Sequence, residues 1–177
     1  MIDVLTREQV AQAEKQTINS GVDVMLLRTN AALAVADAAA LRAEGDRKRT
    51  AVFCGCGGNG YDGLIAACRL KRMGFDTAVY AVGDTRKFSA GALAYARSQG
   101  VALQNADEYT GNADIVIDAV FGIGLNKPIV GEVAELIDKL NAQENALRIA
   151  VDIPSGLDAN TGEVSGTAFR ADVTVSF

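Results

Sequence analysis

Short apolar runs rich in β-branched residues alternate with longer amphipathic stretches from residue 49 onwards. Runs of this kind are typical of buried strands, and the stretches between them have the length of helices. We expect strands at residues 49–55, 77–82, 101–104, 115–121, 148–153 and 173–177. We expect helices at residues 62–73, 89–99 and 130–143. This alternation predicts an α/β fold, a Rossmann-like three-layer α/β/α sandwich with a mainly parallel sheet.

Residues 5–43 precede this alternation and are predicted to form two helices packed outside the sheet. Thr6 and Gln9 have the spacing of a capping box, which would open the first helix, and Gly21 would end it. The second helix, at residues 24–43, is rich in alanine and leucine, as expected of a packing helix. A chain of 177 residues has the size of one domain, so we expect a single domain over residues 1–177.

Composition excludes several classes of protein. The net charge of -5 disfavours a general nucleic-acid or anionic-membrane binder, which needs a basic surface. No stretch approaches the roughly 20 apolar residues of a membrane span, and the charged start has no signal-peptide pattern. The odd count of 3 cysteines predicts a reduced, cytoplasmic protein. With 0 histidines, acid–base chemistry would use other groups, such as carboxylates.

Polar, glycine-rich loops follow three predicted strands, at residues 55–63, 121–128 and 152–158. Parallel strands end at one edge of their sheet, and ligands of such sheets bind beyond that edge. The first loop has glycines at the Gly-x-Gly-x-x-Gly spacing that binds dinucleotides, although a tight turn would explain them too. The next strand ends in Ala-Val-Gly-Asp at 81–84 and lacks the usual acidic residue, which argues against a dehydrogenase.

Three acidic residues of these regions are candidates for chemistry. Asp118 lies within an apolar strand, where a carboxylate needs a cation or hydrogen bonds from neighbouring loop amides. Asp152 ends a strand, a common position for a catalytic carboxylate, and is equally able to cap the N–H groups of Ser155 and Gly156. Asp62 could cap the following helix or accept ligand hydroxyls.

The strings GNGYDG, DAVFGIGL and VDIPSGLDANTG, in this order and at these spacings, resemble the YjeF N-terminal-type domain of the NAD(P)H-hydrate epimerases. The similarity extends over nearly the whole chain. It implies a Rossmann-like fold, a homodimer and an isomerase. Such an enzyme interconverts the R and S epimers of NADHX and NADPHX, nicotinamide cofactors hydrated at C6, so that a partner dehydratase can repair them.

The resemblance also implies site residues. A potassium ion would be held by Asn59, Asp118 and Ser155. Epimerisation by loss and return of the C6 hydroxyl, or by ring opening, needs a carboxylate near C6, and we expect Asp152 to transfer the proton. The implied substrate contacts are Gly58, Asn59, Gly60, Tyr61, Asp62, Gly122, Ile123, Gly124, Leu125, Asn126, Lys127, Pro128 and Asp152.

The sequence departs from the family pattern in several places. Gly58 stands where the family has asparagine, Tyr61 where it has glycine, and residues 27–32 lack its acidic residue and glycine. The chain stops at Phe177, so we expect it to lack the family's C-terminal segment. These departures favour a non-catalytic nucleotide-binding or scaffold module as the alternative function. The intact carboxylates and serine of the implied site favour the enzyme.

Overall fold

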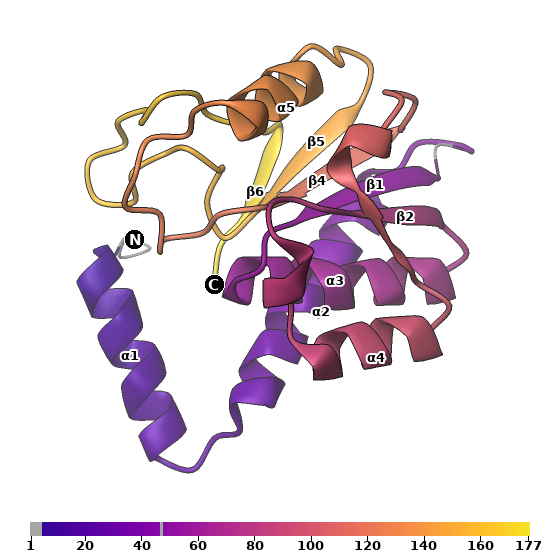
Figure 1. The fold of residues 1–177 in the computed structure, drawn as a ribbon. Helices are drawn as coiled ribbons and strands as arrows, with labels where there is room; N and C mark the ends of the chain where they lie inside the picture. The colour runs from indigo at the N-terminus through magenta and orange to yellow at the C-terminus, as the bar shows by residue number, and fades with distance from the viewer. Residues whose placement is uncertain (1–4, 47) are drawn as a thin grey trace.

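The computed structural model describes residues 5–46 and 48–177 and contains one six-stranded, entirely parallel sheet (Figure 1). Its strands are β1 (Arg49–Cys54), β2 (Asp76–Ala81), β3 (Leu103–Asn105), β4 (Ile115–Ala119), β5 (Leu147–Val151) and β6 (Val173–Val175). The order across the sheet is β3-β2-β1-β4-β5-β6, the doubly wound order of dinucleotide-binding domains. The predicted Rossmann-like α/β fold is therefore confirmed.

Helices cover both faces of this sheet. They are α1 (Arg7–Asn19), α2 (Val24–Arg42), α3 (Gly58–Arg72), α4 (Ala90–Ser98) and α5 (Glu132–Asn141), with short 3₁₀ turns at Thr85–Lys87 and Ala106–Glu108. In Figure 1, α2, α3 and α4 lie on one side of the sheet and α5 on the other. The result is the predicted three-layer sandwich.

Strand alternation divides the core between the two faces. Val52 and Cys54 of β1 belong to the cluster under α2, α3 and α4, whereas Ala51 and Phe53 belong to the cluster on the α5 side. Phe53 stacks on Tyr80, with their ring centroids 5.1 Å apart. Asp118 of β4 is in register with Phe53, so its carboxylate points to the α5 side of the sheet.

The glycine-rich segment after β1 is not the loop that we expected. Helix α3 begins at Gly58 rather than at Asp62, and the first helical bond runs from the N–H of Tyr61 to the carbonyl oxygen of Gly57, at 3.1 Å. A Cβ atom at Gly60 would lie 1.7 Å from the carbonyl oxygen of Gly55. Glycine is therefore required for this turn of the helix to close on the end of β1.

Helix α1 stands away from the sandwich (Figure 1), and none of its residues is buried. Its predicted capping box from Thr6 to Gln9 is confirmed. Near its start, the Arg7 N–H donates to Asn160 Oδ1 at 2.9 Å, and Asn160 Nδ2 donates to Glu8 at 3.3 Å. The prediction of two helices packed on the sheet is correct for α2 and wrong for α1, because α1 buries no side chain.

Helix α2 is the part of the described chain that is long and apolar enough to cross a membrane by length and composition alone. We expected no such stretch. Its alanine-rich face, with Ala32, Val35, Ala36 and Ala39 fully buried, packs in the cluster with α3. The apolar character of α2 is thus used in the core of the sandwich.

Candidate functional site

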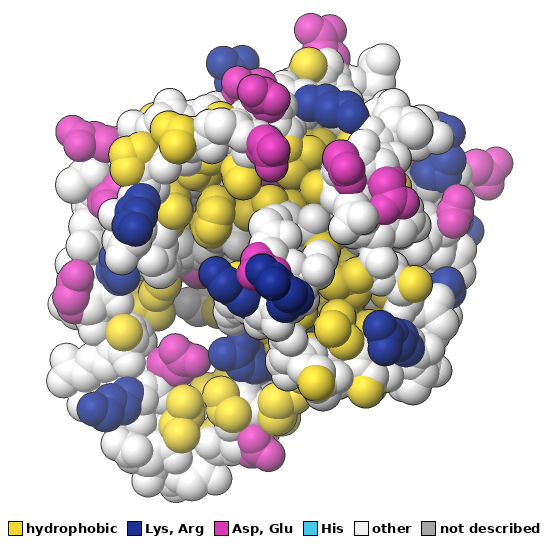
Figure 2. Space-filling model, in the orientation of Figure 1, with side chains coloured by type: hydrophobic (Ala, Val, Ile, Leu, Met, Phe, Trp, Pro, Cys, Tyr) yellow, Lys and Arg dark blue, Asp and Glu magenta, His cyan; other side chains and the backbone are white. Residues whose placement is uncertain are grey.

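A large cavity of about 1170 Å³ lies where the loops after β1, β4 and β5 meet at the carboxyl edge of the sheet. Helix α1 and the start of α2 line its other side, and Figure 2 shows the molecule hollowed between α1 and the sandwich. Strands β1 and β4 are neighbours, although their helical connections run to opposite faces. Ligands of doubly wound sheets bind at such a crossing point.

Most of the predicted substrate contacts line this cavity. They are Gly58, Asn59, Asp62, Gly122, Ile123, Gly124, Leu125, Asn126, Lys127, Pro128 and Asp152. Gly60 and Tyr61 lie outside the lining, because Gly60 is closed against Gly55 and Tyr61 faces α2. The three loops singled out by the sequence are therefore brought together as expected, with these two residues in supporting positions.

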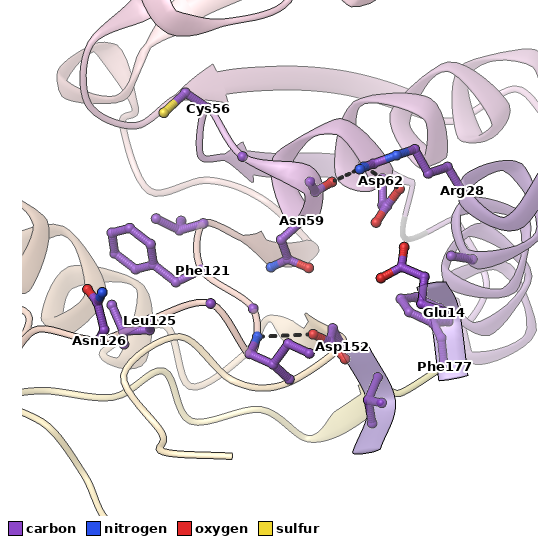
Figure 3. Close-up of a pocket in the computed structure, with 18 of the residues that line it drawn as sticks. Glu14, Arg28, Cys56, Asn59, Asp62, Phe121, Leu125, Asn126, Asp152 and Phe177 are labelled. Atoms are coloured by element: carbon purple, nitrogen blue, oxygen red, sulfur yellow. Dashed lines mark hydrogen bonds and ion pairs between the residues drawn. The ribbon is translucent and has the colours of Figure 1, made fainter. Parts of the chain in front are cut away.

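The first turn of α3 presents unused polar groups to the cavity. Its N-cap residue, Gly57, supplies no side-chain hydrogen bond to the helix N-terminus. The side-chain Nδ2 atom of Asn59 is buried without a hydrogen-bond partner. Asn59 points toward the Asp152 side of the cavity (Figure 3), and its Cγ atom lies 3.4 Å from where a Cβ on Gly122 would be. Both features suit a polar ligand, because buried amide groups are normally paired.

Asp118 and Ser155 form a buried junction below the cavity, each 1% exposed. Asp118 accepts hydrogen bonds from Ser155 N–H at 2.8 Å, Ser155 Oγ at 2.7 Å and Val120 N–H at 3.1 Å. Ser155 Oγ also accepts from the Phe121 N–H at 2.9 Å. Burial raises the pKa of Asp118 to about 6, although these hydrogen bonds lower it. Asp118 therefore joins the β4 and β5 loops through their amides, one of its two predicted roles.

The backbone of Asp152 adopts a strained, left-handed conformation. Its φ of 67° is the one positive value at a non-glycine residue among the described residues. Its N–H donates to the Val175 carbonyl at 2.8 Å, and its Oδ2 accepts from the Ile123 N–H at 3.2 Å. It does not cap Ser155, whose N–H is taken by Asp118. Burial raises the pKa of Asp152, and a strained, half-buried carboxylate in a cavity is typical of a functional site.

Asp62 lies in α3 beyond the first turn, so it does not cap the helix. Its Oδ1 atom is buried without a hydrogen bond, and the Arg28 guanidinium lies 3.7 Å away. Burial raises the pKa of Asp62 to about 7, Arg28 lowers it, and the charges of Asp152 and Glu14 raise it further. Figure 3 shows Glu14, Asp62 and Asp152 facing the same space from three parts of the chain.

Glu14 and Arg28 are site residues that the sequence reasoning missed. Glu14 shares one face of α1 with Val10, Ala13 and Thr17, all of which line the cavity. This spacing of i, i+3, i+4 and i+7 is a sequence signal that was available. Arg28 lies in the segment that departs from the family pattern, and that departure was its signal.

Within residues 5–46 and 48–177, no three His, Cys, Asp or Glu side chains gather in a way that would hold a metal ion. Asp118 and Ser155 are in contact, whereas Asn59 lies above them at the Gly122 loop. The oxygen atoms near this junction are those of a carboxylate, a hydroxyl and the Phe121 carbonyl. Ligands of this kind suit a hard cation.

Comparisons with known proteins identify the family of this chain. A model of the family described as YjeF-related protein N-terminus matches residues 25–177. The chain is 34% identical to the NAD(P)H-hydrate epimerase of Weissella koreensis, over 100% of this chain and 81% of that protein. It is also 34% identical to the NAD(P)H-hydrate epimerase of Limosilactobacillus fermentum, over 98% of this chain and 84% of that protein.

A longer relative and a solved structure extend the comparison. The bifunctional NAD(P)H-hydrate repair enzyme Nnr of Thermofilum pendens is 39% identical over 89% of this chain, which matches 32% of that protein. The crystal structure of yeast ynu0 superimposes with a TM-score of 0.82 at 22% identity, covering 98% of this chain and 79% of that one. This structural similarity supports the fold.

Proposed function

The chain belongs to the family of YjeF-related protein N-termini, and we propose that it is an isomerase that interconverts the R and S epimers of hydrated NAD(P)H. The observation that carries this proposal is the cavity at the β1–β4 crossing point, which is lined by the glycine-rich α3 N-terminus and by Asp152. A helix N-terminus of this kind suits the phosphates of a dinucleotide, and a carboxylate within reach of the nicotinamide ring suits the reaction.

The chemistry uses groups that the chain has. Protonation of the C6 hydroxyl lets it leave as water, while the lone pair of the adjacent ring nitrogen forms an iminium. A water molecule then adds to C6 from the other face and gives up a proton. The position of Asp152 in the cavity lining supports a role in these proton transfers, and burial raises its pKa, which favours the protonated form.

A potassium ion belongs to this proposal. Asp118, Ser155 and the Phe121 carbonyl offer hard oxygen atoms, and the side-chain carbonyl oxygen of Asn59 would add another. Among the described residues, no cationic side chain forms an ion pair with the buried carboxylate of Asp118. A bound potassium ion would supply positive charge near the phosphates. Magnesium fits less well, because it requires short contacts in strict octahedral geometry.

We further propose that the chain acts in the cytoplasm as a homodimer and hands its product to a dehydratase. The free cysteines at positions 54, 56 and 68 support a reducing compartment. The bifunctional relative, about a third of which this chain matches, supports a second activity working with this one.

The proposal is tested by mixing the chain with an S-specific NAD(P)HX dehydratase, ATP and a mixture of both epimers. We expect the R epimer to disappear faster than its spontaneous epimerisation allows. The Asp152→Asn variant should return the rate to the spontaneous value, whereas an exposed control, Asp37→Asn, should not. Tight NADPH binding with no loss of the R epimer would instead favour the non-catalytic nucleotide-binding module.

A further inference from the structure

We propose that Asp62 is a second proton-transferring carboxyl of this site, acting from the wall opposite Asp152, and that Arg28 is its positioning residue. The inference rests on the proposed epimerisation and names the group that serves the other face of the nicotinamide ring. Asp62 comes from α3 and Asp152 from the loop after β5, and both side chains point into the cavity (Figure 3).

Asp62 has the partners of a reactive group rather than of a structural one. Its side chain is 14% exposed, yet its Oδ1 atom makes no hydrogen bond and its nearest cation lies 3.7 Å away. Buried carboxylates with a structural role normally accept several hydrogen bonds, as Asp118 does. Because Oδ1 is enclosed by the protein, a ligand in the cavity that Asp62 lines would meet the exposed remainder of its side chain.

Arg28 is fixed in position by three contacts. Its Nη1 donates to the Gly58 carbonyl oxygen at 3.2 Å, and its guanidinium carbon lies 5.3 Å from the centroid of the Tyr61 ring. The third contact is with Asp62 itself. Gly58 leaves room for this arrangement, because a Cβ there would lie 3.1 Å from Nη1. Arg28, from the segment 27–32 that departs from the family pattern, thus forms one cluster around Asp62 with the departures at 58 and 61.

The charged and titratable groups around Asp62 come from every element that faces it. Arg28 of α2 favours its ionised form, while Asp152 after β5 and Glu14 of α1 disfavour it. Lys127, from the loop after β4, lines the same cavity. Burial is the largest influence, and it holds the pKa of Asp62 near neutral, at about 7. A carboxyl of this kind can give and take a proton at neutral pH.

In the proposed step, protonated Asp62 gives its proton to the C6 hydroxyl and the C6–O bond breaks, releasing water. The lone pair of the ring nitrogen forms the C–N double bond of the iminium. A solvent water adds to C6 on the opposite face, and its proton passes to ionised Asp152. Exchange with solvent restores both carboxyls, and the reverse reaction uses them in exchanged roles.

The test compares wild type, Asp62→Asn and Asp37→Asn across pH in the dehydratase-coupled assay. We expect Asp62→Asn to lower kcat by about 10²- to 10⁴-fold with little change in KM, since it removes a proton transfer and keeps the shape. A residue that only contacts substrate would raise KM instead. The exposed control should match wild type.

Arg28 variants test the positioning role through the pH dependence of kcat, which a purely structural role would leave unchanged. In Arg28→Met, the pKa of Asp62 should rise, so the fall of kcat at high pH should move to higher pH. Arg28→Lys, which keeps the positive charge, should move it less. The same shift should appear in the ¹³C NMR titration of the Asp62 carboxyl carbon, assigned by its loss in Asp62→Asn, without any substrate present.

The possible failures are distinguishable. If wild type is active and Asp62→Asn keeps the same kcat, the role of Asp62 is overturned and the epimerase function stands. A carboxyl signal of Asp62 that titrates near pH 4, the ordinary range of aspartate, would overturn it as well. If wild type itself leaves the R epimer untouched, the proposed function falls and this role falls with it.

Discussion

Two carboxylates of this molecule, the buried Asp118 in β4 and the half-buried Asp62 in α3, lie in contrasting surroundings. Asp118 is 1% exposed and accepts three hydrogen bonds from Ser155 and Val120. Asp62 keeps 14% of its side chain exposed, lacks a hydrogen bond to Oδ1 and has Arg28 at 3.7 Å. Burial raises the pKa of each, to about 6 and about 7 respectively.

The difference teaches that burial alone does not separate a structural acid from a reactive one. The sheet side of the cavity is held by loop amides that converge on one carboxylate. The helix side is held by a single arginine and leaves one carboxylate oxygen of Asp62 without a hydrogen bond. The pKa is raised for both carboxyls although one is structural and the other is proposed to be reactive. Their hydrogen-bond partners distinguish the two roles.

The largest expected effect comes from the matched pair Asp118→Asn and Asp62→Asn. An asparagine at 118 points its NH₂ group at an N–H or O–H donor, so Asp118→Asn should lower the free energy of unfolding by about 2–4 kcal/mol. Asp62→Asn should not lower it, because the loss of the weak ion pair with Arg28 is offset by the removal of a carboxylate whose charged form burial disfavours at pH 7. Urea unfolding at pH 7 measures both. Equal losses in the two variants would contradict the comparison.

A pH series gives the next effect. The pKa of Asp62 is raised from 3.8 to about 7 by folding, so the folded state holds its proton more tightly than the unfolded state. Stability should therefore fall as pH rises from about 4 to about 7. Asp62→Asn should reduce this fall by a few kcal/mol at most, since one pKa unit equals about 1.4 kcal/mol. If the free energy of unfolding changed with pH equally in wild type and Asp62→Asn, the pKa of Asp62 would be the same in the folded and unfolded states, and the prediction would be wrong.

The smallest effect concerns the helical wall of the cavity. Asn160→Ala removes the hydrogen bonds to Arg7 and Glu8, which attach the start of α1 to the loop at 158–163. Because α1 buries no side chain, global stability should change by less than about 1 kcal/mol. Amide hydrogen exchange in α1 should nevertheless become faster than in wild type. Unchanged exchange in α1 would mean that other contacts hold it.

The fold was predictable from the chain because the central strands β1 and β4 are buried on both faces. The run Ile115–Ala119 is buried at every position, so its apolar pattern predicted β4 directly. The start of α3 at Gly58 was not predictable, since glycine is a poor helix former and only the close packing on Gly55 explains it. The exposed position of α1 was missed for a related reason, because its amphipathic pattern predicts a buried face that the described sandwich does not cover.

The site was predictable where it lies on loops at strand ends. Asp152 and the stretch 122–128 follow strands of a parallel sheet, so topology brings them together. Arg28 and Glu14 come from helices that precede the sheet, and no strand-end rule locates them. The sequence left open whether Asp152 caps the Ser155 N–H or acts in catalysis. The structure shows that Asp118 accepts from this N–H, and such side-chain geometry cannot be derived from the sequence.

The crowding between Gly58 and Arg28 also restricts the order in which this site can change. A Cβ atom at 58 would lie 3.1 Å from Nη1 of Arg28, so the guanidinium that contacts Tyr61 and Asp62 would have to shift by a few tenths of an ångström. A side chain at 58 would meet no such obstacle if residue 28 were small. The effect of restoring the family's asparagine at 58 should therefore depend on which residue occupies position 28, so the order of the two changes would matter in directed evolution from this chain.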